Sequence, residues 1–160
     1  MERKTKVHAE NDRHDLLITR EFELPVELLF RAHVDKEIFE EWMTHDHGIV
    51  KVLKMEARKH GGWQFHTSDK QGNVVFSANG VFHDVVQDRK IVRTFEIENS
   101  PMEVQFEYLE FEKLTDDTSR LKMQSIFRSV ALRDQMLKVP FAPGLDMAHN
   151  RLQKVLSKLK

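Results

Sequence analysis

The chain has 160 residues, of which 40% are hydrophobic and 32% charged, and this balance excludes a wholly disordered protein. Lys and Arg number 25 against 26 Asp and Glu, so the formal net charge of -1 predicts no general attraction to nucleic acid or to an anionic membrane. The absence of cysteine excludes a disulfide scaffold, a thiolate metal site and a cysteine nucleophile.

The first residues predict neither a secretory signal nor a membrane anchor. Residues 1–8 contain no apolar segment, and no run in the chain approaches the roughly 18 apolar residues of a membrane helix. We therefore expect a cytoplasmic protein without a membrane partner. Residues 1–13 are polar and unpatterned, which predicts a flexible N-terminal tail before a single domain over residues 14–160.

The first structured elements are predicted as a strand and two short helices. Residues 15–24 are short and β-like. Pro25 follows where a helix can begin, because the missing N–H of proline costs nothing in the first turn. Asp35 is a candidate N-cap for a second helix, with Ile38 and Trp42 on one face.

The central part of the chain predicts a meander of six antiparallel strands. Short turns rich in Gly, Asp, Asn or Pro separate the β-like stretches, and connections this short join antiparallel neighbours. The predicted strands are 49–57, 63–68, 73–86, 90–98, 102–114 and 120–128.

Alternation in the fifth of these stretches assigns its two faces. Apolar residues such as Phe106 and Tyr108 share one face, whereas Glu103, Gln105 and Glu107 share the other. The carboxylates are interpreted as a solvated sheet face, and Glu107 points inward only if the register slips at a bulge.

The last 30 residues predict a long amphipathic helix. Leu145, Ala148, Leu152 and Leu156 belong to one apolar stripe, and Pro143-Gly144 precede it as a breaker. A helix over residues 144–160 would be roughly 25 Å long and would cross a whole sheet. The predicted fold class is therefore α+β, with a curved antiparallel sheet of about six to seven strands wrapped on the C-terminal helix.

Several motifs resemble a known family. Residues 18–22 with 25–32 are similar to the first strand and helix of the START-like, helix-grip (SRPBCC) superfamily. Glu56-Ala57-Arg58, followed by Gly61-Gly62-Trp63, resembles the homologues of the activator of heat-shock-protein ATPase. Many members carry Trp-Trp-Gly-Pro after the second helix, where this chain has Trp42-Met43-Thr44-His45. The resemblance implies a helix-grip fold with an apolar cavity between the sheet and the last helix.

That cavity is where we expect a ligand. Each aromatic or Met side chain alone is better explained as plain core, but as a set they fall on elements that surround the sheet–helix seam, where the resemblance implies a cavity. Tyr108, Arg93, His149 and Arg151 are the candidates for orienting a ligand by polar contacts. The predicted ligand-binding residues are Trp42, Trp63, Phe65, Phe76, Arg93, Phe95, Phe106, Tyr108, Met123, Phe127, Phe141, Met147 and Arg151.

The function predicted from the sequence is a small-molecule binding module for an apolar or aromatic ligand. No catalytic residue is assigned. The alternatives are a polyketide-cyclase-type cyclase or dehydratase that uses Tyr108 and His149 for proton transfer, and a stress-response protein with a chaperone partner. A homodimer through exposed valines such as Val75, Val81 and Val85 also remains open. His45-Asp46-His47 lacks further ligands at metal-site spacing, so no metal and no cofactor are expected.

Overall fold

The computed structural model describes residues 3–160, which form one antiparallel sheet and four helices. The strand order in the sheet is β1-β2-β8-β7-β6-β5-β4-β3. The strands are β1 (Lys6–His8), β2 (Asp15–Phe22), β3 (Ile49–Met55), β4 (Gly62–Ser68), β5 (Val74–Val86), β6 (Lys90–Ile97), β7 (Gln105–Lys113) and β8 (Ser119–Ile126), and the helices are α1 (Val26–Val34), α2 (Lys36–Met43), α3 (Val130–Lys138) and α4 (Phe141–Ser157).

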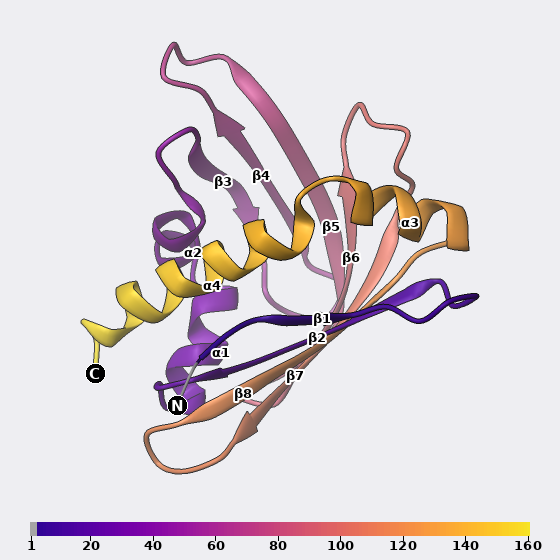
Figure 1. The fold of residues 1–160 in the computed structure, drawn as a ribbon. Helices are drawn as coiled ribbons and strands as arrows, with labels where there is room; N and C mark the ends of the chain where they lie inside the picture. The colour runs from indigo at the N-terminus through magenta and orange to yellow at the C-terminus, as the bar shows by residue number, and fades with distance from the viewer. Residues whose placement is uncertain (1–2) are drawn as a thin grey trace.

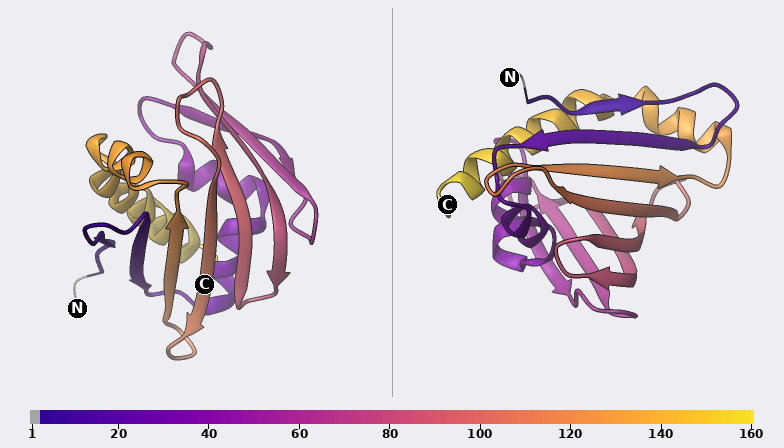
Figure 2. Two further views of the ribbon diagram at one scale, coloured as in Figure 1. Left: turned by 90° about the vertical axis from the view of Figure 1, so that its right-hand side faces the viewer. Right: turned by 90° about the horizontal axis from the view of Figure 1, so that it is seen from below.

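The sheet curves around α4 (Figures 1 and 2). The helix crosses the concave side of the sheet, with α1 and α2 near its C-terminal end and α3 near its N-terminal end (Figure 1). The hairpin that joins β4 to β5 extends beyond α4 (Figure 1). This confirms an α+β architecture of the helix-grip type, with the C-terminal helix held by the sheet. None of the helices over residues 3–160 has the length and apolar character needed to cross a membrane.

The sheet has one more strand than the upper number predicted, and the additional strand lies in the expected tail. β1 pairs antiparallel with β2 through Lys6↔Thr19, Val7↔Ile18 and His8↔Leu17. Thr5 also donates its backbone N–H to Asp146 Oδ1 on α4, at 2.8 Å. The prediction of a flexible tail was therefore wrong for residues 5–8, because a three-residue edge strand is too short to show alternation. The first two residues of the predicted tail lie outside the described residues.

The C-terminal helix begins earlier than predicted. α4 starts at Phe141, so Pro143 and Gly144 lie inside its first turn and do not precede it. Proline is tolerated there because the first-turn N–H groups have no intrahelical partner. The preceding helix α3 was not predicted as a separate element; Ser129 caps it by accepting a hydrogen bond from the backbone N–H of Leu132.

Two hydrophobic clusters fill the concave side. The main core joins the sheet to α1, α2 and α4, and includes Phe22, Leu29, Trp42, Phe82, Leu109 and Leu152. The small core lies under α3 and consists of Leu16, Phe127 and Met136, with Val7, Ile97, Met102, Leu132 and Phe141 packed against it.

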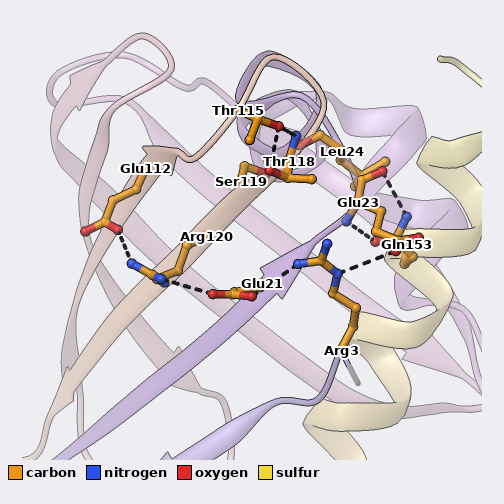
Figure 3. A network of polar contacts seen from close by, with 10 residues as sticks. All are labelled: Arg3, Glu21, Glu23, Leu24, Glu112, Thr115, Thr118, Ser119, Arg120 and Gln153. Atoms are coloured by element: carbon orange, nitrogen blue, oxygen red, sulfur yellow. Dashed lines mark hydrogen bonds and ion pairs between the residues drawn. The ribbon is translucent and has the colours of Figure 1, made fainter. Parts of the chain in front are cut away.

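The opposite, convex side carries a row of ion pairs, which we call the outer row: Glu112, Arg120, Glu21 and Arg3 (Figure 3). Arg120 donates to Glu112 at 2.9 Å and to Glu21 at 3.0 Å, and Arg3 donates to Glu21 at 3.2 Å. The first three residues are register partners on β7, β8 and β2. The row therefore runs straight across three neighbouring strands.

Candidate functional site

A second polar row crosses the same sheet on its concave side. Arg93 on β6 pairs in register with Glu107 on β7, which pairs with Ser125 on β8. Their exposed fractions are 6%, 5% and 1%, and the neighbouring Gln105 is equally buried. We call Arg93, Gln105, Glu107 and Ser125 the inner row.

The inner row separates the two hydrophobic clusters. On β6, Ile91 of the main core lies two residues before Arg93, and Ile97 at the small core lies four residues after it. Phe127 of the small core lies two residues after Ser125, just beyond the end of β8. Because inward positions recur every second residue along a strand, these polar groups occupy the middle of an otherwise apolar surface.

The carboxylate of Glu107 is satisfied on both oxygens. Arg93 Nε donates to Oε1 at 2.8 Å, and Gln105 Nε2 donates to Oε2 at 3.1 Å. The charges of Arg93 and Glu107 therefore balance each other within the row.

Trp63 covers the guanidinium of Arg93. The guanidinium carbon lies 4.1 Å from the centre of the Trp63 ring, which is a cation–π contact. Trp63 also donates its indole N–H to the backbone oxygen of Thr94 at 3.1 Å. Gly80 makes this possible, because a Cβ there would lie 2.4 Å from Trp63 Nε1 and 2.0 Å from the Thr94 oxygen. The absence of a side chain at Gly80 therefore positions Trp63 over the inner row.

Two buried polar atoms of the inner row have no hydrogen-bond partner. They are Arg93 Nη1 and Ser125 Oγ; among the described residues, Arg3 Nε and Arg20 Nε are also buried without a partner, outside this row. Leaving a buried polar group unpaired costs about 1–3 kcal/mol, so such atoms are uncommon in folded proteins. The inner row thus keeps two buried polar atoms that no protein group pairs with.

The apolar side chains around the inner row are not fully enclosed. Phe95 lies two residues after Arg93 on the same face, and Met123 lies two residues before Ser125. Both are half-buried, as is Phe76 on β5, although all three pack against the main core. The concave side therefore keeps partly accessible apolar surface beside the two unpaired atoms.

Two buried histidines on the helices face the interior. Burial lowers the pKa of His33 to about 4 and the pKa of His149 to about 3, so both are uncharged at neutral pH. His149 Nδ1 and Thr5 Oγ1 form a hydrogen bond of 2.7 Å, and His33 Nδ1 bonds the Leu29 backbone oxygen at 2.9 Å. The interior around the inner row therefore carries no net charge from histidine.

The structure brings part of the predicted ligand set together. Trp42, Trp63 and Phe65 are buried within one network of aromatic contacts, which also includes Phe39 and extends to Phe76. Half-buried members of the predicted set beside the inner row or the cores are Phe76, Phe95, Met123 and Phe141, and Phe127 belongs to the small core.

Four predicted ligand residues lie elsewhere. Phe106 and Tyr108 are 46% and 41% exposed on the convex side, and Met147 on α4 is 60% exposed. Arg151 instead donates Nε to the backbone oxygen of Trp42 at 2.9 Å and so joins α4 to α2. Tyr108 and His149, the candidate proton-transfer pair, lie on opposite sides of the sheet.

The face assignment of β7 was wrong for a specific reason. Leu109 and Phe111 are buried in the main core and set the phase of the strand. Strict alternation then places Gln105 and Glu107 inward and Phe106 outward, without any bulge between β7 and its neighbours. The sequence analysis did not predict Gln105, Glu107 and Ser125 as site residues. The apolar residues Leu109 and Phe111 alternate in the same phase as Gln105 and Glu107, and this spacing could have indicated that the two polar residues of β7 point inward.

A separate surface pocket lies beside α1. It has a volume of about 650 Å³ and combines an apolar wall with both basic and acidic side chains, the acidic ones being Glu27 and Asp88, and none of the predicted ligand residues lines it. Its lining includes Phe30, Val34, Val85, Arg31, Arg58 and Lys59. Over residues 3–160, no group of three or more His, Asp or Glu side chains is placed to hold a metal ion.

Comparisons with known proteins place the chain in a family and a fold. The sequence model described as "Activator of Hsp90 ATPase homolog 1-like protein" matches residues 23–157. No match was found among curated proteins.

Several solved structures share the architecture at low sequence identity, which shows the fold alone. Protein Ms6760 from Mycobacterium smegmatis is 19% identical, with a TM-score of 0.84 and 96% of each chain covered. A protein from Rhodobacter sphaeroides is 14% identical, with a TM-score of 0.88 and coverage of 97% of this chain and 99% of that one. A protein from Arthrobacter aurescens is 16% identical, with a TM-score of 0.83 and coverage of 96% and 91%.

Proposed function

Because the chain belongs to the Activator of Hsp90 ATPase homolog 1-like protein family, with a helix held by a curved sheet, we propose that it binds an apolar or aromatic small molecule between the sheet and α4. The ligand lies against the inner row and contacts the half-buried side chains beside it. Phe95 and Met123 supply apolar contact area, and Arg93 and Ser125 orient the molecule.

The observation that carries this proposal is the pair of unpartnered atoms on the inner row. Arg93 Nη1 and Ser125 Oγ are buried without hydrogen bonds inside an apolar surface. Ligand sites are typically apolar with a few placed polar groups, and this part of the concave side has that composition. A purely structural core would be more stable with apolar side chains at the same positions.

The cyclase alternative has less support. Its proposed proton shuttle pairs Tyr108 with His149, yet Tyr108 is 41% exposed on the convex side. His149 is committed to Thr5 and has a pKa lowered to about 3 by burial, which leaves it far from the range of an efficient base at neutral pH. Chaperone association, a homodimer and a cytoplasmic location stay predictions from the sequence.

Binding is tested with the neutral fluorescent probe N-phenyl-1-naphthylamine. We expect its emission to rise when it enters the concave side, and Phe95→Ala to weaken its binding roughly tenfold because apolar contact is lost. The matched control is Phe106→Ala on the neighbouring strand, whose side chain is 46% exposed on the opposite face and whose loss leaves binding unchanged. Absence of binding, or equal effects of the two variants, would contradict the proposal.

A further inference from the structure

We infer that the ligand of the inner row is an uncharged molecule whose apolar body carries an oxygen hydrogen-bond acceptor, such as a ketone, ester or amide carbonyl. This inference rests on the proposed function and specifies the class of molecule that the site takes. It follows from the charge balance of the inner row and from the donors that the row leaves unpaired.

The charge balance selects against an ionised ligand. Arg93 and Glu107 form a buried ion pair at 2.8 Å, with side chains only 8% and 6% exposed. Both Glu107 oxygens already accept hydrogen bonds, and Arg93 is the only cation in the row. A carboxylate ligand would add a buried charge that no group here compensates, and burial of an unpaired charge is strongly unfavourable.

The unpaired atoms select for an acceptor. A guanidinium N–H donates and cannot accept, so Arg93 Nη1 requires an acceptor atom on the ligand. Ser125 Oγ donates as well, and it lies on the same face two strands away, with Glu107 between them in register. An ammonium group, which only donates, leaves Arg93 Nη1 unpaired.

The surroundings of these atoms select for an apolar body. Trp63 covers the Arg93 guanidinium, and Phe95 is the next inward residue along β6. Met123 is the next inward residue to Ser125 on β8. A molecule that reaches the two donors therefore lies against aromatic and thioether side chains, which favour a flat, apolar skeleton.

Three naphthalene derivatives of similar shape separate these requirements: 2-acetylnaphthalene, 2-ethylnaphthalene and 2-naphthoate. Each is titrated against N-phenyl-1-naphthylamine bound to the full chain at pH 7. We expect the ketone to compete roughly tenfold more strongly than the hydrocarbon, since each hydrogen bond contributes about 2- to 10-fold, and more strongly than the carboxylate.

Ser125→Ala tests the donor directly. We expect it to reduce the advantage of the ketone over the hydrocarbon by about 2- to 10-fold, while the affinity for 2-ethylnaphthalene stays unchanged. The matched control is Ser77→Ala, a half-buried serine on the outer face of β5, which leaves both affinities unchanged.

Glu107→Gln tests the charge balance, because it leaves Arg93 uncompensated at nearly constant side-chain shape. We expect the ratio of 2-naphthoate affinity to 2-acetylnaphthalene affinity to rise roughly tenfold or more, since a charge-assisted bond to Arg93 becomes available. Circular dichroism checks that the variant is folded; where it is not, the Ser125→Ala comparison decides alone.

The outcomes distinguish the inference from the function on which it rests. If the protein binds all three derivatives with equal affinity, or prefers 2-naphthoate, the inference is wrong and the proposed function stands. An unchanged ketone preference in Ser125→Ala overturns the donor assignment. If neither N-phenyl-1-naphthylamine nor any derivative binds, the proposed function itself fails.

Discussion

Two polar rows cross the sheet on opposite faces and share strands β7 and β8, and they differ in solvation. In the outer row, the side chains of Glu112, Arg120 and Glu21 are 32%, 33% and 33% exposed (Figure 3). In the inner row, the side chains of Arg93 and Glu107 are 8% and 6% exposed. Both rows follow the register of neighbouring strands, and on β7 the alternation of a single strand sends Glu107 inward and Glu112 outward.

The same residue types contribute differently to the free energy of unfolding on the two faces. The outer ion pairs exchange with water and salt, so each contributes little to the free energy of unfolding. The inner pair is shielded from water, and Nη1 of its own Arg93 and Oγ of the neighbouring Ser125 are unpaired. A protein that needed only stability would gain nothing from such a row, which is why we assign binding to the inner face.

The largest expected effect comes from Glu107→Gln. Breaking a buried pair leaves Arg93 charged and uncompensated, which we expect to lower the free energy of unfolding by about 3–5 kcal/mol. Urea denaturation at pH 7 measures the change. A loss below about 1 kcal/mol would mean that water reaches the inner row, and the contrast between the two faces would then disappear.

The next effect is acid destabilisation through His149. Its pKa is lowered to about 3 in the folded protein, against 6.5 when exposed, so the unfolded state binds more protons between these values. Stability is therefore fully present above pH 6.5 and falls as the pH drops toward 3. Between pH 6.5 and 4.5, before most carboxylates titrate, we expect His149 to account for a loss of roughly 2 kcal/mol.

Urea denaturation at several pH values measures this loss. One variant changes the buried His149 of α4, and the control variant changes the exposed His83 of β5. His149→Gln should flatten the stability profile over this window, whereas His83→Gln, on the exposed convex side, should leave its slope unchanged. His33, with a pKa of about 4, contributes a similar loss that persists in both variants. Equal slopes in wild type and His149→Gln would contradict the burial argument.

The sequence predicted the elements better than their faces. Seven strands and the C-terminal helix were predicted within a few residues of their observed bounds, because turn chemistry and helical spacing are local signals. The inward face of β7 was predicted wrongly. Apolar Phe106 and Tyr108 suggested that the even-numbered residues point inward, whereas Leu109 and Phe111 are buried in the core, and Phe111 contacts Phe30 of α1, so the odd-numbered residues point inward. Burial is a property of the assembled sheet, so tertiary packing decided between two equally regular alternations.

The candidate site was predicted in part. Trp63 and Phe65 were predicted to lie at the sheet–helix seam and are buried in the main core, and Arg93 was predicted as a polar group of the site. Glu107 and Ser125 were missed as site residues, because a charged or hydroxylated side chain on a strand is normally interpreted as solvent-facing. Strand β1 was missed for another reason: its three residues are too few to show alternation, and the contact of the preceding Thr5 is with Asp146 of α4, far away in sequence.

A small effect is expected from Glu112→Gln, the same substitution on the same strand but on the outer face. Glu112 accepts hydrogen bonds from Arg120 at 2.9 Å and pairs with Lys122 at 2.8 Å, with its side chain 32% exposed. We expect a loss of no more than about 1 kcal/mol, which shrinks further in 1 M salt because exposed pairs are screened. A salt-independent loss as large as that of Glu107→Gln would refute the distinction between the rows.

The smallest effect, and the most informative, is expected from Ser125→Ala. Ser125 and Ser119 are both buried and inward on β8, but Ser119 donates to the backbone oxygen of Leu24 at 2.7 Å (Figure 3), whereas Ser125 has no partner. Removing the paired hydroxyl in Ser119→Ala should cost about 1–2 kcal/mol, because it leaves the Leu24 oxygen unsatisfied. Removing the unpaired one should leave the free energy of unfolding unchanged or raise it by up to about 1 kcal/mol, as measured by urea denaturation. Equal losses in the two variants would show that Ser125 is already satisfied in the free protein, and that its hydroxyl is a structural group with no role in binding.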